Sequence, residues 1–240
     1  YLIQILANET AAYARLLYTF LQQQNADFFA DPTAIKLDTP EAKAAVEFMK
    51  RIVDEGLSTT NLDYPAAVSG FTDGAGGIAV NGTWLIGAFE DQSQQEGNAL
   101  SGGGYTVYPV PQFFGGQDST YADGHGWVVP KNPKRDDETT DAIGKLFKYL
   151  AENDFQWART GHLPAVSSVF DMQEFKDLPH RDNIAEIAST GESLPGEVQR
   201  QFAIQDIIGE EVGAAVTGDK SVEDALATAQ ARINDLLSNL

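Results

Sequence analysis

The strongest constraint on the fold is an alternation of long amphipathic helix patterns with very short apolar runs. The segment 39–56 predicts a helix with Thr39 as its N-cap and Pro40 at its first position, and its apolar residues recur at helical spacing. The segments 136–153 and 221–237 have the same periodicity. Beyond about residue 136 the chain is therefore expected to be nearly all helical.

Each of the two later helices is expected to bury one apolar face. In 136–153 that face consists of Ala142, Ile143, Leu146, Phe147 and Leu150. The last helix begins where Ser221 and Asp224 have capping-box spacing. Its predicted buried face consists of Val222, Ala225, Leu226, Ala229, Ile233, Leu236 and Leu237.

The short apolar runs predict strands. One covers about 77–80, and the others lie within 102–112 and 124–133, where prolines end them. Short strands among many helices place the chain in the α/β class.

Composition excludes several functions. No apolar run approaches the roughly 20 residues that a membrane-spanning helix needs. The net charge of -19 would repel nucleic acid and anionic lipid surfaces. The chain has no cysteine, which excludes disulfides, thiolate metal sites and cysteine nucleophiles. Solubility is the main consequence of its acidity.

Motifs for catalysis, cofactors and metals are missing as well. The three histidines do not have the i, i+4 spacing of a helical zinc pair, and no aspartate-rich calcium loop occurs. The glycines of 74–77 precede a strand instead of following one, and there is no Gly-Lys-Ser/Thr and no Gly-x-Ser-x-Gly. We therefore expect no metal, no cofactor and no enzymatic activity. Carboxylate pairs such as Glu90 with Asp91, or Asp118 with Asp123, leave a glycosidase open as an alternative.

Aromatic side chains gather near the predicted loops, and they are Trp84, Tyr105, Tyr108, Tyr121, Trp127 and Trp157. A sugar ring has an apolar C–H face and a hydroxylated edge, so an exposed aromatic beside polar groups can bind both parts. Trp84 follows an Asn-Gly turn, and His125 lies between two glycines that allow close approach of the backbone. Tyr105 and Tyr108 are expected to be structural.

The order of segments resembles the C-terminal part of the extracellular solute-binding proteins of carbohydrate ABC transporters, the family that includes maltose-binding protein. The resemblance runs from about residue 10 to the end and rests on seven segments in order: "LDTPEAKAAVEFMKRIVDEGL", "GGIAVNGTWLIGAF", "YTVYPVPQ", "GHGWVVPKNP", "WARTGHLPAVSSVF", "ESLPGEV" and "GDKSVEDALATAQARINDLL".

This resemblance implies a periplasmic-binding-protein-like (type II) fold of two α/β lobes that enclose the solute by hinge closure. Residues 1–125 and 176–240 would form the C-terminal lobe, and 126–175 would be a remnant of the N-terminal lobe that includes a hinge crossing. The family's N-terminal portion, with its signal peptide and most of the first lobe, is expected to be absent from this chain.

The resemblance also implies a site. In the sugar-binding members the Trp of the Asn-Gly-x-Trp stretch stacks on the ligand, which is Trp84 here. A segment where the chain crosses between the lobes, and one loop of the other lobe, would bring further residues to the cleft. A helix near Gln201 would contribute an aromatic side chain. The candidate substrate-binding residues are Trp84, Asp123, Gly124, His125, Trp127, Gly161, His162 and Phe202.

The function implied is capture of a sugar or oligosaccharide outside the cell and its delivery to the transmembrane subunits of an ABC permease. The protein would be extracellular or periplasmic, and it would touch a membrane only through the permease or through a lipid anchor outside this chain. Two alternatives stay open, a glycosidase and a binding protein of the same shape for a polyamine, an iron complex or a peptide.

Overall fold

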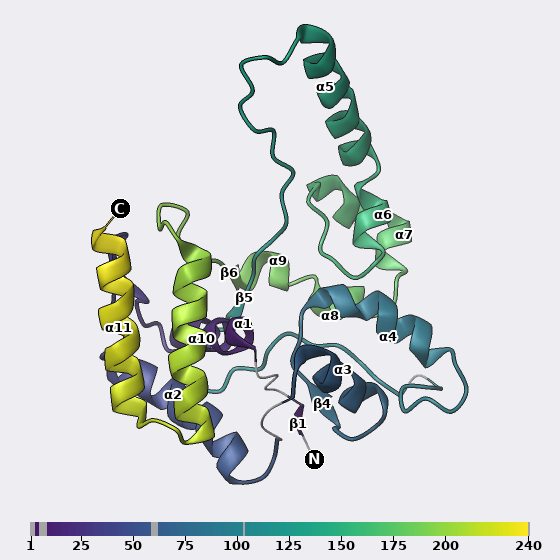
Figure 1. The fold of residues 1–240 in the computed structure, drawn as a ribbon. Helices are drawn as coiled ribbons and strands as arrows, with labels where there is room; N and C mark the ends of the chain where they lie inside the picture. The colour runs from purple at the N-terminus through teal and green to yellow at the C-terminus, as the bar shows by residue number, and fades with distance from the viewer. Residues whose placement is uncertain (1–2, 5–8, 59–61, 103, 240) are drawn as a thin grey trace.

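The computed structural model describes residues 3–4, 9–58, 62–102 and 104–239 (Figure 1). The elements of the first half are β1 (Ile3–Gln4), α1 (Thr10–Gln23), β2 (Phe29–Asp31), β3 (Ala34–Ile35), α2 (Pro40–Asp54), α3 (Tyr64–Thr72), β4 (Ile78–Ala79), the 3-10 turn η1 (Thr83–Leu85), α4 (Ile86–Ser93) and β5 (Thr120–Tyr121). Those of the second half are α5 (Asp137–Glu152), α6 (Asp154–Ala158), the 3-10 turn η2 (Ser167–Asp171), α7 (Gln173–Lys176), α8 (Arg181–Ile184), α9 (Ile187–Thr190), β6 (Gly191–Glu192), α10 (Gln201–Thr217) and α11 (Val222–Ser238).

Four helices, α1, α2, α10 and α11, form the main core (Figure 1). The predicted caps begin two of them: the Thr39 hydroxyl accepts from the Ala42 amide, and the Ser221 hydroxyl accepts from the Asp224 amide. In α11 the predicted stripe is buried except for the half-buried Leu236. The fully buried side chains at the centre of this core include Leu17, Leu21, Val46, Met49, Ile204, Ile208, Val212 and Ile233.

Helices α1 and α10 approach each other closely at Gly209. A Cβ added to Gly209 would lie 2.2 Å from the Thr10 Cα and 2.3 Å from its carbonyl oxygen. Both are backbone atoms, so no side-chain movement could relieve the overlap. Glycine is therefore required for α1 to lie directly against α10.

The strands pair only in twos among the described residues. β1 and β4 are parallel, β2 and β3 are antiparallel, and β5 and β6 are parallel. The strand predicted at 77–80 is confirmed as β4, although shorter. The strands predicted within 102–112 and 124–133 are wrong: their described residues run without regular structure, and residue 103 lies outside the described part. An apolar run becomes a strand only where a neighbouring strand offers its hydrogen bonds, and β5 at 120–121 has that partner in β6.

Helix α5 is confirmed, and its N-cap Asp136 accepts a hydrogen bond from the Thr139 amide. Its predicted buried face is wrong, because none of its residues is buried: Ala142 and Leu146 are exposed, and Ile143, Phe147 and Leu150 are half-buried. In Figure 1 α5 stands away from the main core at the end of a long extended segment. Periodicity indicates which side of a helix suits burial, but no described element covers that side here.

A second, smaller core is separate from the first. Ala158, Val169 and Phe175 form it, with Phe155 and Met172 among the partly buried residues around it. It holds α6, η2 and α7 together. Within the described ranges, no helix is both long enough and apolar enough to cross a bilayer.

A polar stripe of α1, which we define as Arg15, Thr19 and Gln23, holds the segment 111–123. These residues are spaced i, i+4 and i+8, so they share one face of the helix. The buried Gln23 amide donates to the Pro111 and Ser119 carbonyl oxygens and accepts from the Phe113 amide. The Thr19 hydroxyl accepts from the Tyr121 amide at 2.9 Å, and Arg15 pairs with Asp123 at 3.3 Å. The stripe therefore fixes where β5 and Asp123 lie.

Buried Glu211 ties α10 to α11. It pairs with Lys220 and, at 2.8 Å, with Arg232, which also reaches Glu210 at 2.7 Å. Burial pushes the pKa of Glu211 up, but the hydrogen bonds from Lys220 and Arg232 outweigh it, so the pKa lies below its ordinary value.

The contact at Gly209 predicts opposite effects for two glycine substitutions in helices. Gly209→Ala should lower the free energy of unfolding by about 2 kcal/mol or more, because the new methyl overlaps backbone. Gly144→Ala on α5, where nothing lies within 4 Å of the added Cβ, should raise it by about 0.5–1 kcal/mol through helix propensity. Urea unfolding of both variants checks this, and equal effects of the same sign would contradict the packing argument.

The Glu211 pairs predict a stability that depends on acid pH. Since the folded state lowers this pKa, the contribution is complete above the unfolded value of about 4.3 and is lost as pH falls through the folded value. Glu211→Gln should cost about 1–3 kcal/mol at pH 7, and Glu210→Gln, whose side chain is exposed, below about 1 kcal/mol. Urea unfolding at pH 7 and at a series of pH values below 4 measures both, and a gap between wild type and Glu211→Gln that does not narrow as the pH falls would refute the assignment.

Candidate functional site

Trp84 lies in η1 and is 36% exposed. The Asn-Gly turn expected before it is absent, because Gly82 has an extended backbone with φ -80° and ψ 156°. Its ring folds back over Gly82, where an added Cβ would lie 1.9 Å from the Trp84 Cζ3 atom. The indole N–H donates to the Tyr64 hydroxyl at 2.8 Å, and that hydroxyl donates to the Asn81 side chain at 3.2 Å. Glycine at 82 therefore permits the ring position, and Tyr64 fixes it.

Arg15 brings Trp84 and Asp123 together. Its guanidinium carbon lies 5.9 Å from the Trp84 ring centroid and 5.7 Å from that of Tyr121, within cation–π range of both. Its Nη2 is 3.3 Å from an Asp123 carboxylate oxygen. Burial, and then the Asp123 carboxylate, raise the pKa of Tyr121, while Arg15 acts against them. This part of the site combines aromatic faces, a cation and a carboxylate.

A second group contains His125, Trp157 and His162. The rings of Trp157 and His162 stack at 3.9 Å, and His125 lies edge-on to them at 6.3 and 6.4 Å. The Thr160 hydroxyl donates to the Trp157 carbonyl oxygen at 2.7 Å, so His162 Nδ1, 3.0 Å away, is the donor to Thr160. Burial, and then the charge of His125, lower the pKa of His162, which keeps its Nε2 an acceptor at neutral pH.

Gly161 connects the two groups. A Cβ on this residue, whose φ is +124°, would lie 2.2 Å from the Thr83 carbonyl oxygen, and the Gly87 amide donates to the Thr160 carbonyl oxygen at 3.1 Å. The turn 160–161 therefore packs by backbone against η1 and α4. Trp84 is next to one partner of this contact, Thr83, and His162 is next to the other, Gly161.

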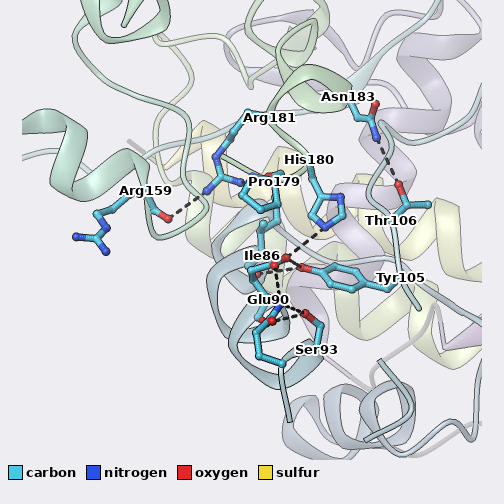
Figure 2. A network of polar contacts seen from close by, with 11 residues as sticks. Ile86, Glu90, Ser93, Tyr105, Thr106, Arg159, Pro179, His180, Arg181 and Asn183 are labelled. Carbon is cyan, nitrogen blue, oxygen red and sulfur yellow. Dashed lines mark hydrogen bonds and ion pairs between the residues drawn. The ribbon is translucent and has the colours of Figure 1, made fainter. Parts of the chain in front are cut away.

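A polar network holds α4 and the 158–160 turn in place (Figure 2). His180, whose φ is +64°, contacts the Glu90 carboxylate at 3.5 Å and lies against the Tyr105 ring. Burial, and then Glu90, raise the pKa of Tyr105, whose hydroxyl reaches both Glu90 and the Ile86 carbonyl oxygen. Buried Arg181 donates to the carbonyl oxygens of 158, 159 and 179. Tyr105 is structural as predicted, whereas Tyr108 is 69% exposed, which contradicts that expectation.

The other predicted site residues, Gly124, Trp127 and Phe202, belong to neither of these two groups. Gly124 has nothing within 4 Å of an added Cβ, and Trp127 is 75% exposed in the extended segment toward α5. Phe202 is 81% exposed in the first turn of α10. It is three residues before Gln205, which lines a cavity together with Arg15. The structure therefore groups Trp84 with Asp123, and His125 with His162, while Trp127 and Phe202 stay apart.

Sequence reasoning missed Arg15 and did not include Tyr64, Tyr121 or Trp157 among the site residues. One signal existed for Arg15, because it is the only charged residue of α1. A lone charge in an otherwise apolar helix needs a partner or a role. The partner, Asp123, is 108 residues away and could not be found from spacing.

The grouped side chains are suited to binding. Aromatic faces, a guanidinium, a carboxylate and an imidazole acceptor can contact the apolar and hydroxylated parts of one solute. A larger pocket of about 490 Å³ lies elsewhere, at α7 and α8, and no predicted site residue lines it. Across the described residues, no three His, Asp or Glu side chains gather as a possible metal site.

Comparison with known families gives one match. A model described as "Bacterial extracellular solute-binding protein" matches residues 5–183, about three quarters of the chain. The chain belongs to this family. No curated protein matches its sequence.

Solved structures show the fold of this solute-binding protein. It is similar to the cyclic alpha-maltosyl-1,6-maltose binding protein from Arthrobacter globiformis (23% identity, TM-score 0.75, 96% of this chain and 57% of that one). It is also similar to the sugar-binding protein MalE from Xanthomonas citri (19% identity, TM-score 0.80, 100% of this chain and 58% of that one). A third similar structure is the maltose/maltodextrin-binding domain MalE from Bdellovibrio bacteriovorus bound to maltotriose (20% identity, TM-score 0.77, 99% of this chain and 59% of that one). The fold is thus the helix-rich α/β fold of periplasmic binding proteins, and the chain spans less than two thirds of the length of these three.

The Trp84 turn predicts a local effect of Gly82→Ala. The new methyl would displace the indole and break its hydrogen bond to Tyr64, so one of the three tryptophan indole N–H signals in an NMR spectrum should move. Tyr64→Phe, which removes the acceptor, should move the same signal and leave the other two. If neither variant moves an indole signal, Trp84 does not have this position.

Proposed function

We propose that this solute-binding protein captures a sugar or oligosaccharide and that Trp84 is the platform on which a sugar ring stacks. The observation that carries the proposal is the half-exposed indole held by Tyr64 beside the Arg15–Asp123 pair. An indole face suits the C–H face of a pyranose, and the charged pair suits its hydroxyls. The proteins of similar fold include binders of maltose-type sugars, which supports this ligand class.

The second group of the site would contact the same ligand from another side. His125, Gly161 and His162 reach the region of Trp84 through the Gly161–Thr83 contact. Gly124 would allow close backbone approach, and Trp127 and Phe202 would add aromatic surface on closure. These roles follow the family resemblance and the geometry together.

We assign residues 1–125 and 176–240 to one lobe and 126–175 to the other. Two observations support this division. The main core is built from α1, α2, α10 and α11, while the small core is separate and, apart from Leu178, lies within 126–175. The apolar side of α5, with Leu146 52% and Tyr149 62% exposed, would pack inside the second lobe. A ligand held between the lobes would favour their closure because it contacts both only then.

Delivery to the transmembrane subunits of an ABC permease follows from the family's role, with the protein acting in the extracellular or periplasmic space. No bond of the solute is made or broken in this role. One carboxylate of each pair that could have served a glycosidase is engaged otherwise, Glu90 by Tyr105 and His180 and Asp123 by Arg15.

The test is a thermal-shift screen with neutral mono- and oligosaccharides, amino acids, polyamines and metal ions. A sugar at about 100 times its dissociation constant should stabilise the folded protein by about 2.7 kcal/mol. Trp84→Ala should abolish the shift, and Tyr108→Ala, which removes an exposed aromatic outside the site, should keep it.

Three results would contradict the proposal. One is a shift only with polyamines, amino acids or metal ions. Another is a sugar shift that survives Trp84→Ala. The third is release of shorter sugars on prolonged incubation, which would favour the glycosidase.

A further inference from the structure

The polar edge of Trp84 is already used inside the protein. Its N–H donates to the Tyr64 hydroxyl at 2.8 Å, so the indole can offer a ligand only its apolar face. The hydroxyls of a stacked sugar must therefore be met by neighbouring side chains. Arg15 is in that position, since its guanidinium lies 5.9 Å from the Trp84 ring centroid.

Arg15 and Asp123 together match what a hydroxyl group requires. A hydroxyl both donates and accepts, the guanidinium only donates and the carboxylate only accepts. The two side chains are 32% and 45% exposed, so a ligand can reach both. Within the described chain the Arg15 Nε–H is buried without a hydrogen-bond partner, and Asp123 is the ion-pair partner of the Nη2 group.

The approach to Arg15 is from its exposed side. A cavity that Arg15 lines together with Tyr18, Gln205 and Ile208 holds about 20 Å³. That volume has room for one water molecule and not for a sugar ring.

The positive charge of Arg15 is balanced by its neighbours. The positive charge of Arg15 is compensated by Asp123, and neighbouring Tyr121 adds none, because burial holds its hydroxyl in the neutral form. A carboxylate on a ligand would therefore meet the Asp123 carboxylate in a chain whose net charge is -19. A neutral hydroxylated ligand meets no such repulsion.

We propose that the Arg15–Asp123 pair is a specificity determinant that makes this site accept neutral sugars and reject acidic ones. The inference rests on the proposed function, because it concerns which sugars the Trp84 platform accepts. Asp123 has two roles in it: it accepts a sugar hydroxyl, and it prevents the guanidinium from binding a carboxylate in two parallel hydrogen bonds.

The experiment titrates the 240-residue chain with maltotriose and with trigalacturonic acid, two trisaccharides that differ in charge. Binding is followed through the Trp84 indole N–H signal. Wild type should bind maltotriose and not the acid. Asp123→Asn should raise the ratio of acid to neutral affinity by about tenfold or more, since it leaves the Arg15 guanidinium uncompensated.

Asp118→Asn is the matched control, because it makes the same change of charge at an exposed position five residues earlier. It should leave the ratio unchanged. Arg15→Gln combined with Asp123→Asn should remove the gained affinity for the acid. Arg15→Gln alone, which keeps Asp123, should weaken maltotriose binding without gaining the acid, so the test does not depend on one variant folding.

The outcomes separate this inference from the proposed function. If Asp123→Asn keeps the wild-type ratio, or if wild type already prefers trigalacturonic acid, the specificity role is overturned while sugar capture stands. If neither trisaccharide moves the Trp84 signal and the wider sugar screen is also negative, sugar capture fails, and this inference fails with it.

Discussion

Helix α1 and its two different faces determine the arrangement of the main core and of the segment 111–123. Its apolar side lies directly against α10, which is possible only because Gly209 has no side chain to meet the Thr10 backbone. Its polar stripe of Arg15, Thr19 and Gln23 binds the segment 111–123 through backbone and carboxylate partners. Packing on one side and hydrogen bonds on the other thus set the position of Asp123 relative to the main core.

The helices could be predicted well because their signals are local. Thr39 and Ser221 begin their helices with the expected side-chain caps, since a cap depends only on residues two or three positions away. The strands expected within 102–112 and 124–133 are not formed, and the sequence could not show this, because a strand is defined by a partner whose position no local pattern reveals. The prediction of a buried face on α5 is wrong for a related reason: the periodicity correctly predicts a helix, but burial depends on a covering surface that the described residues do not provide.

The features of the candidate site also divide into those that the local sequence indicates and those that depend on long-range contacts. Trp84 is predicted as a candidate from its local sequence, and in the structure Gly82 leaves the space that its ring occupies. Its neighbours are set by long-range contacts: Tyr64 lies 20 residues away, and Asp123 lies 108 residues from Arg15. Spacing along the chain could not show that one arginine of α1 joins the predicted tryptophan to the predicted aspartate.

An ion pair at this place is compatible with the reversible ligand binding that we propose. Arg15 and Asp123 are both partly exposed, so their attraction is screened by water and contributes little to stability. Under the proposed function each would exchange a water molecule for a sugar hydroxyl at small cost, while the Trp84 ring keeps its position over Gly82. In that function the aromatic surface would provide the binding energy and the screened pair the discrimination. This division of roles would allow a solute to be recognised and then released to another protein.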